Sequence, residues 1–295
     1  MPVPSWKSVP PGIYPWETTF NKIFANTNIP RPKGETICIF SDYGGDNQNS
    51  LYETISVLYV DLDASNEWEY KRQLVRQKFL PDGRRMSFKN LNDRKRREAI
   101  IPFLAAADEI SGINVTLAIQ KKIKSLYSNK EAKELLEKHL NTTGNWKEYA
   151  FERVLRVAHL ISFLVAGLSS PNQNIYWVSD EDNLFANDAK SKDMAKVLSG
   201  FSGVYVEHTL GELGIGTTKI DEEDRGIEDF ASIPDLMAGA VAEITTKLSK
   251  TYSGGIPKGL ASSLPEKLGP KTDLLCRWLS DNTQKLKRTV IGMCQ

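Results

Sequence analysis

Cysteine is scarce in this chain: Cys38, Cys276 and Cys294 are the only three among 295 residues, and no two form a Cys-x-x-Cys pair. An odd number of widely spaced cysteines argues against a disulfide framework and against a zinc knuckle. Histidine is equally scarce, with three residues whose spacing matches neither a metal motif nor a catalytic triad. The sequence therefore points away from disulfide-stabilised folds, zinc knuckles and histidine triads.

Long hydrophobic runs are also missing. The most apolar segment, Leu155 to Leu168, is shorter than a bilayer crossing requires and contains His159. Residues 1–16 are rich in proline and lack the basic and apolar regions of a secretory signal. We therefore expect a cytoplasmic protein with no membrane partner.

Neither sign of charge dominates, since the formal net charge is only +1, and this predicts no general attraction to nucleic acid or membranes. The charges are nevertheless unevenly distributed. Residues 71–98 hold eleven basic and three acidic side chains, whereas residues 180–235 hold fourteen acidic and five basic ones. This asymmetry is typical of a basic substrate track beside an acidic metal site, although solvated helix faces would produce much of it too.

Apolar, branched segments alternate with helical patterns along the chain. Strands are expected at residues 36–41, 51–60, 85–89, 113–119, 174–178 and 203–207. Helices are expected at residues 67–79, 93–110, 130–139, 146–168, 189–198, 232–248 and 271–291. Strands interleaved with helices predict an α/β fold, with a sheet flanked by helices.

Three regions are expected along the chain. Residues 1–34 form a proline-rich N-terminal arm, whose aromatic side chains suit packing across a surface. Residues 35–250 form the α/β domain, with a helical insertion at about 120–170, and residues 251–295 form a linker and a C-terminal helical extension. The arm is a candidate contact for a second copy of the chain, giving a homo-oligomer, or for a protein partner.

Four aspartates stand near the ends of apolar segments. Asp42 follows the first expected strand, and Asp180 follows the strand at 174–178, with Asp182 as the alternative. Asp229 lies in an acidic loop before the helix expected to start at position 232, and Asp235 lies in its first turn. Carboxylates at the carboxyl ends of parallel strands converge on one edge of a sheet, where they hold divalent cations. The pattern predicts a site for Mg²⁺ or Mn²⁺.

Three of these aspartates have a simpler explanation. Asp42 precedes Tyr43-Gly44-Gly45-Asp46 and would begin a hairpin turn. Asp180 would belong to an acidic loop that initiates a helix. Asp235 has the strongest competing role, because Ser232-Ile233-Pro234-Asp235 has the spacing of a capping box with proline at the first helical position.

Basic residues suggest where a substrate would bind. Lys89 would meet a phosphate group from a short strand, although a solvated lysine at a sheet edge is the competing explanation. The cluster Arg94, Lys95, Arg96 and Arg97 would track a nucleic-acid backbone, with salt-dependent binding. The same cluster would equally be the solvated face of a helix.

The order of these residues resembles an RNase H-like fold, in which an aspartate ends the first strand, a later strand supplies a second and a C-terminal helix supplies the last. More narrowly, the chain is similar over residues 36–248 to the bacterial and phage family known as domain of unknown function 3800. The family's opening motif corresponds to Ile39-Phe40-Ser41-Asp42-Tyr43-Gly44-Gly45, and its closing motif corresponds to residues 229–239. Three positions depart from the family pattern, where glutamate, glutamate and glutamine are usual: Tyr43, Ser87 and Ser232.

This resemblance implies a nuclease-like site with two divalent cations, Mg²⁺ or Mn²⁺, which activate water and stabilise the leaving oxygen. It implies that Asp42 bridges the cations, that Asp180 and Asp235 flank them, and that Asp229 is a ligand or orients one. Lys89 would neutralise the scissile phosphate. The leading hypothesis is a nuclease that acts on DNA or RNA in phage defence. The alternative is an inactive RNase H-like binding or scaffold protein, and a phosphohydrolase of small nucleotides is a weaker one.

Overall fold

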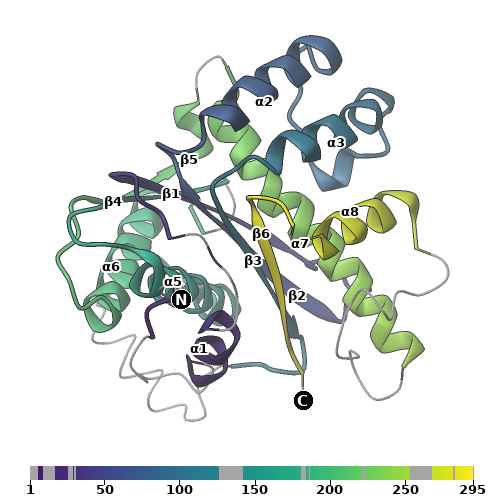
Figure 1. Cartoon of the computed structure of the whole chain (residues 1–295). Helices are drawn as coiled ribbons and strands as arrows, with labels where there is room; N and C mark the ends of the chain where they lie inside the picture. The colour runs from purple at the N-terminus through teal and green to yellow at the C-terminus, as the bar shows by residue number, and fades with distance from the viewer. Residues whose placement is uncertain are drawn as a thin grey trace. The chain divides into compact units, whose positions relative to one another are not determined.

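The computed structural model describes residues 6–8, 17–25, 29, 31–125, 142–180, 184–185, 187–221, 224–252, 268–281 and 283–294. Within them the protein is an α/β structure with seven α-helices and a six-stranded mixed sheet of order β5-β4-β1-β2-β3-β6 (Figure 1). The α/β prediction is confirmed. The chain divides into unit 1, Met1–Ile39 with Lys124–Thr217, and unit 2, Phe40–Ile123 with Thr218–Gln295.

Unit 1 contains helices α1 Glu17–Ala25, α5 Glu148–Leu168 and α6 Asp188–Tyr205, and strands β4 Asn174–Ser179 and β5 Leu213–Thr217. Strand β1, Thr36–Gly44, begins in unit 1 and ends in unit 2. Strand β4 pairs in parallel with β5. Helix α5 packs on α6 and is buried from Phe151 to Leu168, which explains why its sequence is apolar on nearly every side.

Unit 2 contains strands β2 Tyr52–Asp61, β3 Gly112–Gln120 and β6 Lys287–Met293. Its helices are α2 Asn66–Phe79, α3 Arg94–Ala107, α7 Gly226–Thr251 and α8 Pro270–Ser280, with short 3₁₀ helices η1 Phe88–Asn90 and η2 Thr218–Ile220. Strand β3 is antiparallel to β2 and parallel to β6. Helix α7 contacts β2, β3 and α8, so its apolar face covers part of the sheet (Figure 1).

Several segments differ from the sequence-based expectation. Residues 85–87, expected to be in a strand, have no regular structure and lead into η1. Residues 203–205, also expected in a strand, complete α6, because Phe201 and Tyr205 are buried on the same helical face. The expected helix at 271–291 is α8 followed by β6, since branched residues from Thr289 to Ile291 favour an extended chain.

The N-terminal arm is not wholly extended. Residues 17–25 form α1, in which Phe20 and Phe24 are buried, and the Trp6 ring lies 4.6 Å from the Phe24 ring between centroids. The arm therefore packs on the interior of its own unit. The helix expected at 130–139 and most of the expected linker lie outside the described residues.

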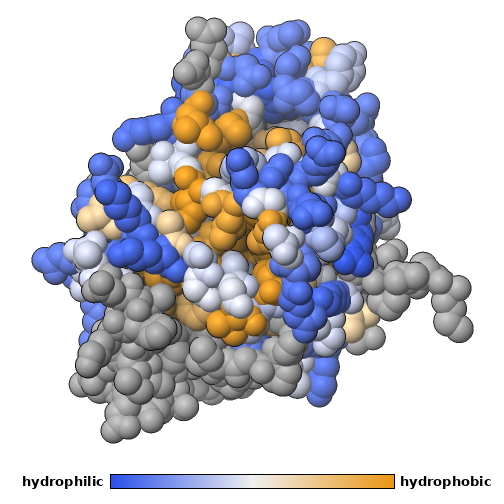
Figure 2. Space-filling view, turned by 90° about the vertical axis from the view of Figure 1, so that its left-hand side faces the viewer, coloured by the Kyte–Doolittle hydropathy of each residue, from blue (hydrophilic) through white to orange (hydrophobic). Residues whose placement is uncertain are grey.

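None of the described helices is long and apolar enough to cross a membrane. Figure 2 shows one side of the molecule, where hydrophobic side chains gather near the centre and hydrophilic ones surround them. Strand β5, at one end of the sheet, is half-buried at every position. Exposed large hydrophobic residues also occur singly on other elements, among them Leu74 on α2, Ile101 on α3 and Val204 on α6.

Candidate functional site

Asp235 lies inside helix α7 rather than at its start. The helix begins at Gly226, which places Asp235 in the third turn and Pro234 within the helix. The Ser232 hydroxyl, expected as a cap, donates instead to the Glu228 carbonyl oxygen at 2.7 Å, as it would in a helix interior. The capping-box prediction is therefore wrong, because the chain is already helical when it reaches Ser232.

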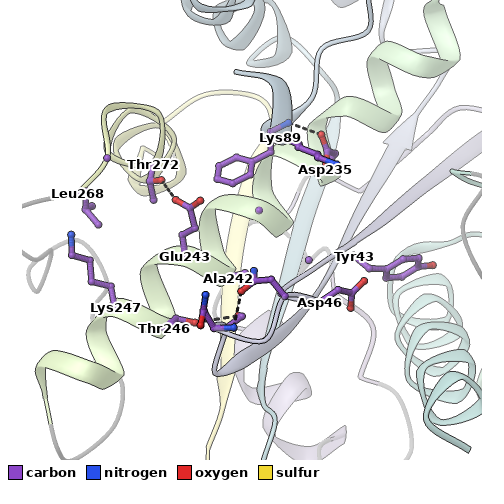
Figure 3. A pocket seen from close by; sticks show the side chains of 18 of the residues that line it. Tyr43, Asp46, Lys89, Asp235, Ala242, Glu243, Thr246, Lys247, Leu268 and Thr272 are labelled. Atoms are coloured by element: carbon purple, nitrogen blue, oxygen red, sulfur yellow. Dashed lines mark hydrogen bonds between the residues drawn. The ribbon is translucent and has the colours of Figure 1, made fainter. Parts of the chain in front are cut away.

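A hydrogen bond joins Asp235 to the segment that carries Lys89. The backbone N–H of Phe88 donates to Asp235 Oδ2 at 2.7 Å, across 147 positions of sequence (Figure 3). Gly239, one turn after Asp235, allows this approach, because a Cβ atom there would lie 2.2 Å from the Phe88 ring. Two residues singled out from the sequence, Asp235 and Lys89, are thus brought together within unit 2.

The end of β1 runs alongside α7. The Phe40 ring stacks on the Phe230 ring with 5.1 Å between centroids. Further along both elements, Gly44 approaches α7 so closely that a Cβ atom there would lie 2.8 Å from the Ala238 carbonyl oxygen. The four residues from Phe40 to Gly44 on β1 and the eight from Phe230 to Ala238 on α7 each span about 12 to 13 Å. The strand and the helix therefore cover the same distance between the two contacts.

On β1, Asp42 lies midway between Phe40 and Gly44, the residues that make these two contacts. Because alternate residues of a strand face the same side, Asp42 lies on the same face of β1 as Phe40 and Gly44. Asp235 is midway between the two contacts on α7 to within one residue, so the two residues lie at a similar level along these neighbouring elements. Asp42 is half-buried, and its Oδ1 accepts the Tyr43 N–H at 2.6 Å. The hairpin turn begins only at Gly45, with φ of 82°, so Asp42 belongs to the strand and not to the turn.

A pocket of about 640 Å³ opens in unit 2 beside these residues. Its wall combines the β1–β2 turn, η1, one side of α7 and the start of α8 (Figure 3). Its charged side chains are Asp46, Lys89, Asp235, Glu243, Lys247 and Lys250. Lys89 has no hydrogen bond or ion pair with the described part of the chain. Carboxylates mixed with an available lysine suit a phosphate group accompanied by a cation.

Asp229 belongs to a buried ion-pair network. Arg76 donates Nε to Oδ2 at 2.5 Å and Nη2 to Oδ1 at 2.6 Å, and Arg72 Nη1 donates to Oδ2 at 3.1 Å. Burial raises the pKa of the Asp229 carboxyl, whereas Arg76 and Arg72 lower it. Because both oxygens accept guanidinium N–H groups, we expect the carboxylate to remain charged at neutral pH. Its oxygens are therefore already engaged by cationic groups.

Arg72 extends this network to two further acids. Its side chain is fully buried and also bonds Glu69 and Asp224. Burial alone would lower the pKa of Arg72, but the bonds to Glu69 and the charge of Asp229 raise it above its usual value. The network ties α2 to the first turn of α7. Arg72 and Arg76 are one helical turn apart, so their side chains lie on the same face of α2, where a single acid can contact both.

Asp180 follows β4 directly, as the sequence predicts, and it is half-buried. It belongs to unit 1, whereas Asp42, Asp229 and Asp235 belong to unit 2. Its alternative, Asp182, lies outside the described residues. The role of Asp180 as a metal ligand stays a prediction.

Part of the basic cluster Arg94–Arg97 is paired with nearby acids. Arg94 contacts Glu98 at 2.9 Å, and Lys95 contacts Asp82 at 2.6 Å. These pairs are at least partly exposed, and they stabilise the first turn of α3 and the turn that precedes it. The charge that this cluster presents to a nucleic acid is consequently smaller than the sequence indicates.

Asp42 and Asp235 lie at a similar level on neighbouring elements, and of the two Asp235 is the one that lines the pocket. Within the described residues, no group of three or more His, Cys, Asp or Glu side chains is placed to hold a metal ion. The described residues thus supply some, but not all, of the ligands that a divalent cation needs. They supply a carboxylate pair in unit 2, and the sequence alone assigns a third ligand.

No model of a known protein family matches this chain, and no curated protein matches it significantly. The resemblance of the opening and closing motifs to the domain of unknown function 3800 family therefore stays an expectation.

Sequence reasoning missed part of this site. Thr246, Lys247 and Lys250 line the pocket together with Asp235 and Gly239. These residues recur at helical spacing along α7, a period that the sequence already displayed. The signal was overlooked because the same helix also carries an apolar face that satisfies the pattern of a core helix.

Proposed function

We propose that this protein is a metal-dependent nuclease with an RNase H-like fold that cleaves phosphodiester bonds in DNA or RNA. One observation carries the proposal: the Phe88 N–H bonds Asp235, so a carboxylate and Lys89 share one pocket wall. A carboxylate for a cation beside a lysine for phosphate is a combination that suits metal-dependent cleavage of a phosphodiester.

The order of the elements supports this proposal. Asp42 lies in β1, the hairpin partner β2 follows, Asp180 comes directly after β4, and Asp235 lies in the later helix α7. This is the order that the RNase H-like resemblance implies. The level positions of Asp42 and Asp235 on neighbouring elements give further support.

In this proposal Asp42 and Asp235 hold Mg²⁺ or Mn²⁺, and the role of Asp180 stays a prediction from the sequence. A bound divalent cation activates water and stabilises charge on the phosphate. The Phe88 N–H holds Asp235 Oδ2 and so fixes the orientation of the carboxylate. Lys89 binds a non-bridging phosphate oxygen and offsets its negative charge.

Asp229 has a different role here from the ligand that the resemblance implies. Because its oxygens accept three N–H groups of Arg72 and Arg76, we assign it to positioning. It anchors the first turn of α7, and the rigid helix then sets the place of Asp235 six residues later.

Labelled single-stranded DNA and RNA, incubated with the purified protein and Mg²⁺ or Mn²⁺, test the proposal. Asp42→Asn and Asp235→Asn should each lower the cleavage rate by about 100-fold or more, because the cation supplies several kcal/mol. Asp188→Asn, which changes an exposed acid in the first turn of α6, is the matched control and should cleave normally. Circular dichroism should show an unchanged fold in all three. Unaltered cleavage in both site variants would reject the proposal.

A binding or scaffold protein without catalysis is the second candidate. The engagement of Asp229 by arginines favours it, since one of the four aspartates is already used structurally. Calorimetry with Mn²⁺ separates the two. Binding that disappears in Asp42→Asn supports the nuclease, whereas no binding and no cleavage by the wild type supports the scaffold.

A further inference from the structure

One side of α7 lines the pocket far beyond Asp235. Gly239, Thr246, Lys247 and Lys250 follow at helical spacing, so they lie along the same side of the helix. From Asp235 to Lys247 the helix rises about 18 Å, at 1.5 Å per residue. Figure 3 shows Lys247 on the Leu268 side of the pocket, away from Asp235. The site is therefore elongated along α7 rather than centred on one carboxylate.

The two ends of this elongated pocket differ in charge. Lys247 is half-buried and Lys250 is exposed, and neither has an ion-pair partner within the described residues. On α7, the acid that lies between them and Asp235 is Glu243, while the other acid of the pocket, Asp46, comes from the β1–β2 turn. Glu243 accepts a hydrogen bond from Thr272 Oγ1 at 2.5 Å and lies 3.6 Å from Lys271 Nζ. With Glu243 partly neutralised, the far end of the pocket is positive.

The wall between the two ends includes small and hydroxyl-bearing residues. Gly239 and Ala242 come from α7, and Gly44 comes from the end of β1. Ser50 Oγ lies 3.2 Å from Thr246 Oγ1, which adds two hydroxyl groups to this wall. Small side chains let a polymer backbone approach the helix closely.

Building on the proposed nuclease function, we infer that the substrate is a single-stranded polynucleotide lying along α7, with Lys247 and Lys250 binding phosphates distant from the one cleaved. At 3.4 Å per stacked nucleotide, the 18 Å from Asp235 to Lys247 corresponds to about five nucleotides. A single nucleotide cannot reach both ends. A pocket of about 640 Å³ is in the size range of small-molecule sites, so it is too small to enclose a double helix, and a longer strand would lie along it with part of each nucleotide in solvent.

The double variant Lys247→Ala/Lys250→Ala tests this inference, with Lys78→Ala/Lys192→Ala as a charge-matched control. The control residues are exposed and do not line the pocket. Each pair is placed in the Asp42→Asn background, which prevents cleavage, and binding of fluorescent 12-nucleotide DNA and RNA strands is measured between 0.05 and 0.5 M salt. The active versions are assayed on the same strands and on bis(p-nitrophenyl) phosphate, which occupies only the reacting site.

Loss of two phosphate contacts should reduce the slope of log affinity against log salt by about 1.4 for a single strand. Relative to 1 M salt this corresponds to about 25-fold weaker binding at 0.1 M. Hydrolysis of bis(p-nitrophenyl) phosphate should stay unchanged, and the control pair should match the parent in both assays. A duplex of the same sequence should bind more weakly and respond equally to both pairs.

Each other outcome has a distinct meaning. If Asp235→Asn is inactive but the lysine pair leaves strand binding and its salt slope intact, the inference is overturned and the nuclease function stands. An equal loss on the strand and on the small diester, or faster turnover of mononucleotides than of strands, also overturns it. If Asp42→Asn and Asp235→Asn cleave normally, the nuclease assignment fails, whatever the lysine pair does to binding.

Discussion

Replacing Asp229 with leucine removes a carboxylate that two buried arginines share. Among the described residues, the Arg76 side chain then retains only a long hydrogen bond of 3.4 Å to the Arg84 carbonyl oxygen, and Arg72 retains Glu69 and Asp224. Those two acids are 40% and 65% exposed, so their bonds to Arg72 are screened and add at most about 1 kcal/mol each. Removing one partner of a buried pair costs about 3 to 5 kcal/mol, and we expect Asp229→Leu to lose this much.

The free energy of unfolding measured by urea denaturation at pH 7 checks this value. Asp224→Asn is the matched control, since it removes an exposed acid of the same network and should cost less than about 1 kcal/mol. The double variant Arg76→Met/Asp229→Leu should recover much of the loss, because no buried charge is left without its partner.

A different result would refute the positioning role. If Asp229→Leu loses less than about 1 kcal/mol while Mn²⁺ binding measured by calorimetry disappears, the arginines do not depend on Asp229. Asp229 would then be the metal ligand that the sequence resemblance implies.

Two further predictions concern residues outside the cation site. Gly239→Ala should destabilise the protein by about 1 to 3 kcal/mol and slow cleavage, because its Cβ would meet the Phe88 ring at 2.2 Å. Gly203→Ala, with no atom within 4 Å of its Cβ, should instead stabilise α6 by up to about 1 kcal/mol; a gain in both variants contradicts the close contact. Burial lowers the pKa of His159 well below 6.5, so the folded protein holds it neutral while the unfolded chain protonates it. Stability should therefore fall below pH 6.5 by up to about 1.4 kcal/mol per pH unit, and urea titrations of His159→Leu should lose that slope.

The elements that the sequence predicted correctly are those whose local pattern and environment agree. The branched residues at 113–119 became β3, and Asp93 caps α3 by accepting the Arg96 N–H at 3.2 Å. The segment at 203–207 has equally strong strand formers, but packing of α6 on α5 overrides that preference. Tertiary contacts decided the outcome wherever local propensity was ambiguous.

The sequence nominates the members of the candidate site, but it does not give their arrangement. Asp42, Asp235 and Lys89 are each readable as chemistry-bearing residues. The bond between the Phe88 N–H and Asp235 is not readable, because it depends on a glycine that leaves room for an aromatic ring across 147 positions. The pairing of Asp229 with Arg72 and Arg76 is not readable either, since these partners lie on α2, about 150 positions earlier.

During synthesis, the pairing of β3 with the parallel strand β6 is delayed until β6 has been made. Ile113 of β3 lies beside Lys287 of β6, about 170 residues later in the chain. At roughly 5 to 20 residues per second, a ribosome needs about 10 to 30 seconds to make that stretch. Throughout this interval one edge of β3 has no strand to pair with, and such edges promote association between nascent chains. Expression at lower protein concentration or in the presence of a chaperone should therefore increase the yield of folded protein.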